Sequence, residues 1–204
     1  MMKRVGMLLK LENSYFIRNK LLIMIPVLYG IFTVMGVLMA TMDGKASSFE
    51  VNMFGILNMF SQLSHLGFAF ILLNAFAREH NSHTYFWLKK HLFQEKERIL
   101  AKYLFYILVI CGSSLLYFAG VAVVLKMVLF PNAIVSWAKL GTAILVTMAS
   151  LLYTTVLQLY FGYLGKSFLK NVSKWVVFWL SISLLNGVLP VVGGYLSPFD
   201  VASV

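Results

Sequence analysis

The chain has 204 residues, of which 60% are hydrophobic, 15% are aromatic and only 12% are charged, and its mean hydropathy is +0.84. Soluble domains carry about 25% charged residues, so this composition excludes that class and predicts an integral membrane protein. The net charge of +10 does not indicate nucleic-acid binding, because most of the basic residues flank apolar runs, as they do in the cytoplasmic loops of membrane proteins.

The segment 1–20 predicts an amphipathic helix. It combines several basic residues with apolar residues at roughly helical spacing: Val5, Leu8, Leu9, Tyr15 and Phe16. We expect it to form an elbow helix in the cytoplasmic interface of the membrane. It does not fit a cleaved signal peptide, because polar residues such as Glu12 and Arg18 interrupt it and the apolar run that follows lacks a small-residue cleavage pattern.

Apolar runs that could cross a bilayer follow this segment. A membrane helix needs about 20 residues, and the runs of sufficient length are 21–42, 54–76, 103–125, 140–164 and 175–195. We therefore predict an all-α, polytopic membrane helix bundle over residues 1–204, a single transmembrane domain with an elbow helix and five visible spans. The last residues, 196–204, are too few to cross again.

The distribution of basic residues predicts the orientation. Five basic residues lie in 1–20, six in 77–102 and three in 165–174, which gives fourteen on one side, whereas the other side holds only Lys45, Lys126 and Lys139. Basic residues in short loops remain in the cytoplasm. We expect a multi-pass protein of the cell membrane with its N-terminus and the loop 77–102 in the cytoplasm.

The second predicted span is unusually polar. Asn58, Ser61, Gln62 and His65 recur at spacings of three and four residues, which places them on about one helical face, and Asn74 follows in the same run. Such a face turns away from lipid, toward protein or water. Hydrogen bonding between helices is the favoured interpretation, and a substrate path is the alternative.

The long polar segment 77–102 contains three histidines, His80, His83 and His91, but we expect no metal site there. The segment has no cysteine, its carboxylates lack a ligand spacing, and Cys111 lies alone in an apolar run. Tyr85, Leu88 and Leu92 instead predict the apolar side of a short helix. That helix either lies in the lipid interface or is presented to a soluble partner, and the periodicity fits both.

The order of these parts resembles permease subunits of type 2 ABC exporters, small bacterial peptide and drug exporters among them. In that family the corresponding loop begins with a glutamate, contains Gly-Thr before an apolar helix, and ends on a basic residue, Ile or Leu, and a lysine. The matching residues here are Glu79, Thr84, Arg98, Ile99, Leu100 and Lys102, and His83 stands where glycine is common. The family usually has a sixth span, so we expect this sequence to be truncated, and a naturally shortened variant is the alternative.

The resemblance implies a mechanism in which ABC ATPase subunits bind the loop as a coupling helix. Its contact residues would be Glu79, Thr84, Tyr85, Leu88, Leu92 and Arg98. The chain lacks the P-loop pattern GxxxxGKS/T. We therefore expect ATP and Mg to bind to the ATPase and no cofactor to bind to this chain. A second permease copy, identical or paralogous, would complete a path lined by Asn58, Gln62, His65 and Asn74. We expect a hydrophobic or amphipathic substrate, such as a peptide, taken from membrane lipid.

Rival functions come from different classes. A membrane enzyme needs clustered acids or histidines, and the chain offers only Glu79 with His80 and His83, so we expect a transport subunit without catalytic residues. A membrane scaffold or an immunity protein without energy coupling would use the same helices, and it remains the alternative to the permease.

Overall fold

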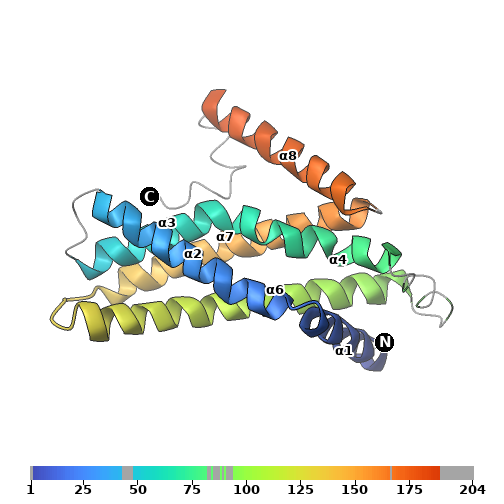
Figure 1. The fold of residues 1–204 in the computed structure, drawn as a ribbon, viewed down its shortest axis with the longest axis horizontal. Coiled ribbons are helices and arrows are strands. Elements are labelled where there is room, and N and C mark those ends of the chain that lie inside the picture. Colours follow the sequence, from blue (N-terminus) through green and yellow to red (C-terminus); the bar gives the residue numbers. More distant parts are fainter. Residues whose placement is uncertain are drawn as a thin grey trace.

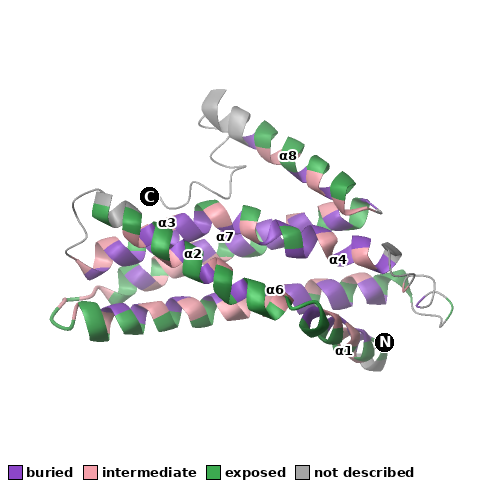
Figure 2. Ribbon diagram, viewed as in Figure 1, coloured by how far each residue is buried: buried purple, intermediate pink, exposed green. Residues whose placement is uncertain are grey.

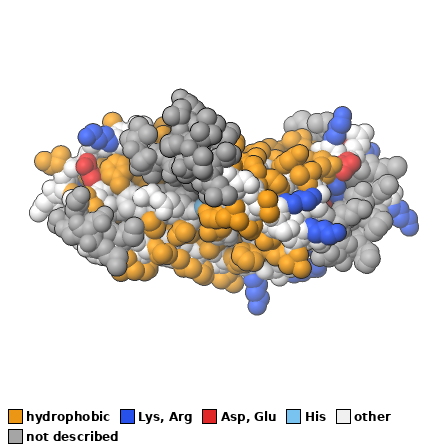
Figure 3. All heavy atoms as spheres, turned by 90° about the horizontal axis from the view of Figure 1, so that it is seen from above, with side chains coloured by type: hydrophobic (Ala, Val, Ile, Leu, Met, Phe, Trp, Pro, Cys, Tyr) orange, Lys and Arg blue, Asp and Glu red, His pale blue; other side chains and the backbone are white. Residues whose placement is uncertain are grey.

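The computed structural model describes residues 2–42, 48–81, 84, 88, 90, 94–165 and 167–188, and these form helices without a strand. Four of the described helical segments are long and apolar enough to cross a membrane: Leu21–Leu38, Phe49–Glu79, Glu95–Leu129 and Trp137–Leu164. Among the described atoms in Figure 3, hydrophobic side chains gather over the middle of the face, and Lys and Arg lie mainly toward one end. The protein is therefore a polytopic helical membrane protein.

The middle helices run along one long axis, whereas the first two and the last are inclined to it (Figure 1). The first is α1, Met2–Arg18, which turns through Asn19 and Lys20 into α2, Leu21–Met42. Lys20 has a φ of 55°, in the left-handed region, and this residue marks the change of direction between the two helices. Residues 21–42 are the span that the sequence predicts.

The second predicted span is two helices, α3, Phe49–Gly67, and α4, Ala69–Asn81, separated at Phe68. The helix starts earlier than predicted because Ser48 caps it, accepting a hydrogen bond from the Val51 backbone N–H. It also ends later than predicted, because charged residues of its last turns find partners inside the chain. The break at Phe68 follows Gly67, and a glycine in a helix interior weakens the helix.

The third span is α6, Glu95–Val124, extended by a π-helical turn, η1, Leu125–Leu129. It begins eight residues before the predicted 103, so residues 95–102, which the sequence assigned to the loop, are helical. At its start the Gln94 backbone N–H donates to the Glu97 carboxylate at 3.2 Å, which is a capping interaction. The polar loop between α4 and α6 is correspondingly shorter than 77–102.

The last described helices are α7, Trp137–Leu164, and α8, Phe168–Val188. The four candidate membrane spans do not include α8. Its first turns hold Lys170, Asn171 and Lys174, so only the stretch after them is apolar, and the predicted continuation to residue 195 lies outside the described residues. The fifth span and the sixth remain predictions, as does the interfacial position of α1.

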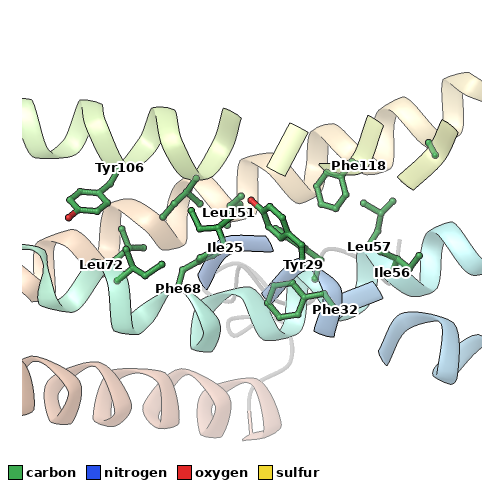
Figure 4. Packing of buried hydrophobic residues seen from close by; sticks show 14 of the residues in the cluster. Ile25, Tyr29, Phe32, Ile56, Leu57, Phe68, Leu72, Tyr106, Phe118 and Leu151 are labelled. Carbon is green, nitrogen blue, oxygen red and sulfur yellow. The ribbon is translucent and has the colours of Figure 1, made fainter. Parts of the chain in front are cut away.

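An aromatic core holds α2, α3 and α6 together (Figure 4). The Phe60 ring packs against Phe32 at 5.3 Å and against Phe118 at 4.8 Å between ring centroids, and the rings of Tyr29 and Tyr117 stack at 4.5 Å. The outer surface of α2 is exposed along most of its length, whereas α3 and α4 are largely buried (Figure 2). The most enclosed element is therefore the polar second span, as expected of a helix that turns polar groups away from lipid.

Candidate functional site

A buried cluster of charges lies where α1, α4 and α6 meet. Glu79, near the end of α4, accepts from the Arg98 guanidinium at 3.0 Å and forms a second ion pair with the Lys102 ammonium at 3.0 Å. Lys102 also pairs with Glu12 of α1, and its Nζ donates to the Ala75 backbone carbonyl at 2.9 Å. We call Glu12, Glu79, Arg98 and Lys102 the ionic cluster.

The ionic cluster is withdrawn from solvent, with Lys102 only 1% exposed. Its two carboxylates and two cations balance, and buried charges are tolerated where they are paired and hydrogen-bonded in this way. At its rim the Arg98 guanidinium reaches Glu95 at 3.5 Å, and the Tyr163 hydroxyl of α7 donates to the same carboxylate at 3.1 Å. The cluster therefore joins helices that are far apart in the sequence.

Aromatic side chains enclose the cluster. The Lys102 Nζ lies 5.3 Å from the centroid of the Phe76 ring, and the buried Tyr106 hydroxyl accepts from the Arg78 guanidinium at 2.6 Å. Phe16 of α1 packs edge to face against Tyr106. These rings exclude water from the ion pairs, and a low local dielectric strengthens each of them.

We call residues 82–94, between α4 and α6, the central loop, and two of its described residues contact α1. The Thr84 hydroxyl and the Tyr15 hydroxyl share a hydrogen bond of 2.7 Å, and Leu88 is buried against Val5, Leu8 and Ala101. The apolar stripe of α1 thus packs on α6 and on this loop. Leu88, which the sequence suggested as an anchor for a partner, faces inward in this conformation and packs within the chain.

The structure therefore brings together four of the six predicted contact residues around one region: Glu79 and Arg98 directly, with Thr84 and Leu88 beside α1. Tyr85 and Leu92 lie outside the described residues, as do His83 and His91 and the side chain of His80. The contact of Glu79, Thr84 and Arg98 with a partner remains a prediction.

Sequence reasoning missed Glu12 as a member of the site. The missed signal is its position, because Glu12 lies on the buried stripe of α1 with Val5, Leu8 and Phe16. A carboxylate on an otherwise apolar helical face indicates a buried partner. Lys102 was matched to the family pattern, but its pairing with a residue ninety positions earlier has no local signature.

The residues predicted to line a substrate path separate into different environments. The Gln62 amide donates to the Asn58 side-chain oxygen at 3.0 Å on an accessible side of α3, and Asn74 is half-buried in α4. His65 is buried, and its ring stacks on Trp179 of α8 with centroids 5.5 Å apart. Its backbone carbonyl accepts from the Gln158 amide of α7. This arrangement is compatible with both interpretations of the polar residues, namely hydrogen bonding between helices and a substrate path.

Comparison of the chain with protein-family models, with curated proteins and with solved structures found no match.

Proposed function

We propose that this chain is the permease subunit of an ATP-driven ABC transporter, which exports a hydrophobic or amphipathic substrate such as a peptide. ATP hydrolysis then belongs to separate ATP-binding cassette subunits that dock on the central loop. The chain supplies the membrane path together with a second permease copy.

The ionic cluster is the observation that carries this proposal. Glu79 lies just before the central loop, and Arg98 and Lys102 lie just after it, so their ion pairs close the base of the loop. Lys102 extends the connection to Glu12 in α1. A force applied to the loop is therefore delivered to three helices at once, and separating α1 from them would leave the Glu12 carboxylate buried without its ion-pair partner Lys102.

The same arrangement supports a division of roles within the loop. Leu88 binds the loop to α1, and a displacement of the loop must then move α1 as well. Partner recognition falls to other residues of the predicted helix, of which Tyr85 is the best candidate from the sequence. Docking of a partner is thereby converted into tilting of α1, α4 and α6, as energy coupling requires.

The test is co-purification from detergent with the ATP-binding cassette subunit encoded nearest to this chain, followed by ATP hydrolysis in nanodiscs. Tyr85→Asp should abolish both the complex and its hydrolysis. Ile134→Asp is the matched control, because Ile134 is 97% exposed beyond η1, at the other end of α6 from the loop, and the same chemical change there should leave the complex intact.

Leu88→Asp serves a separate purpose. It should lower the melting temperature of the isolated chain, because it buries a carboxylate among Val5, Leu8 and Ala101. A chain that binds no ATPase would argue against the permease, whereas a complex that tolerates Tyr85→Asp would place the docking site elsewhere on the chain. The first of these outcomes would favour a membrane scaffold or an immunity protein.

A further inference from the structure

A second group of polar side chains lies within the membrane-spanning part of the bundle, between α3 and α7. The Gln158 amide of α7 donates to the backbone carbonyl of His65 in α3. Ser61 lies one helical turn before His65, and Thr155 one turn before Gln158. Because α3 and α7 run in the same direction (Figure 1), Ser61 and Thr155 lie at the same level. We call Ser61, His65, Thr155 and Gln158 the polar seam.

Three side-chain oxygens of the seam are buried without a hydrogen-bond partner in the part of the chain that the structure describes. Among the described residues, Ser61 Oγ, Thr155 Oγ1 and Gln158 Oε1 have no hydrogen-bond partner, although Thr155 and Gln158 are each 1% exposed. The neighbouring Thr154 differs, because its hydroxyl donates to the backbone carbonyls of Ser150 and Leu151. A buried polar atom without a partner is costly, and several at one place indicate a binding site for a polar group.

The seam is suited to an uncharged group. The charged residues of α3 and α7 are Glu50 and Lys139, and both lie in the first turns of their helices, far along the chain from the seam. An ionised ligand would therefore be buried without a counter-charge, at a high free-energy cost. Gln158 Oε1 is an acceptor, so the ligand must donate a hydrogen bond. A hydroxyl or an amide on an apolar chain meets these requirements.

Helix α8 covers the seam through Trp179, whose ring stacks on His65. Near its start the helix is held to the bundle, where the Asn171 amide donates to the backbone carbonyls of Leu73 and Gly162 at 3.0 Å and Trp175 is buried. Beyond that point α8 diverges from the bundle (Figure 1). Rotation of α8 about its first turns would lift Trp179 from the seam.

We propose that the polar seam binds uncharged hydrogen-bonding groups, a hydroxyl or an amide carried on an apolar chain, and that Trp179 covers it in this conformation. Only the claim that the bound molecule is transported rests on the proposed function. Binding itself requires no ATPase, so the two are tested separately.

The experiment uses the full chain in proteoliposomes without any partner. Thr155→Cys and Thr154→Cys are compared in a Cys111→Ser background, because Cys111 is the sole cysteine of the sequence. Both positions are buried in this conformation. N-ethylmaleimide should nevertheless modify position 155 about tenfold faster than position 154, because displacement of Trp179 should admit the reagent to the seam and Thr154 is not part of the seam. Octanamide should slow the reaction at 155, and octylammonium and octanoate should not.

Valine has nearly the same shape as threonine, so Thr155→Val and Thr154→Val provide a second pair of variants in case the cysteine variants misfold. Octanamide should raise the melting temperature of the unaltered chain and of Thr154→Val, but not that of Thr155→Val. Equal, slow modification at both positions would overturn the site. Fast modification at position 155 that octanamide does not slow would mean that the seam holds water, and it would overturn the proposed ligand class. Equal protection by all three octyl compounds would show nonspecific partitioning into the protein and would overturn the ligand class as well.

Discussion

At the residue scale, Lys102 is the centre of the ionic cluster. Its ammonium contacts Glu12, Glu79 and the Ala75 carbonyl, and its side chain is 2% exposed. The carboxylates of the ionic cluster are Glu12 and Glu79. Arg98 neutralises Glu79, and its guanidinium also contacts Glu95 at the rim of the cluster. The position of α1 against α4 and α6 therefore depends on one cation more than on any single apolar contact.

Lys102→Met should destabilise the chain by about 3–5 kcal/mol, because it keeps the apolar stem but leaves the Glu12 carboxylate buried without its counter-charge. Thermal unfolding in detergent measures the effect. Lys96→Met is the matched control, since Lys96 is exposed on the same helix and should shift the melting temperature little. Equal melting temperatures for the two variants would contradict the central role of Lys102.

At the element scale, the contact between α2 and α3 depends on a glycine. A Cβ atom at Gly36 would lie 2.5 Å from the Ile56 Cα, so the backbones of the two helices approach more closely than any side chain permits. Small residues at such crossings are typical of membrane helices, because van der Waals packing rather than the hydrophobic effect holds them together. Gly36 thus determines how near α2 lies to the polar second span.

Gly36→Ala should destabilise the bundle by about 1–3 kcal/mol, because the helices must separate to admit the methyl group. Gly30→Ala, on the same helix, meets no atom within 4 Å and should be neutral or slightly stabilising. Melting temperatures of the two variants in detergent test the pair. A tolerant Gly36→Ala would mean that α2 is free to move relative to α3.

At the scale of the whole molecule, the fold places three of the connections between helices at the same end of the bundle. The turn between α1 and α2, the central loop and the connection from α7 to α8 all lie at the end of the bundle where α1 packs (Figure 1). The segments 1–20, 77–102 and 165–174, which comprise these connections and the adjoining parts of the helices, contain fourteen of the seventeen basic residues. This arrangement agrees with the positive-inside rule, and orientation in the cell is the corresponding prediction.

Cysteine accessibility tests that orientation. In a Cys111→Ser background, Ile134→Cys should react with a membrane-impermeant thiol reagent on intact cells, and Lys96→Cys should react only after the cells are opened. Both residues are exposed, and they lie at opposite ends of α6. The reverse pattern would place the N-terminus and the central loop outside the cell and would remove the basis for a cytoplasmic ATPase.

The sequence by itself determined the helical membrane class and the position of most spans, because the polar backbone in lipid must be satisfied within long apolar helices. It also indicated Glu79 and Arg98, each as a residue of the predicted coupling loop and not as an ion pair. Only the tertiary structure decided that Glu12 joins Lys102, that Leu88 faces α1, and that Gln158 meets His65. These contacts depend on the rotation and crossing of helices distant in the chain, which local periodicity does not specify.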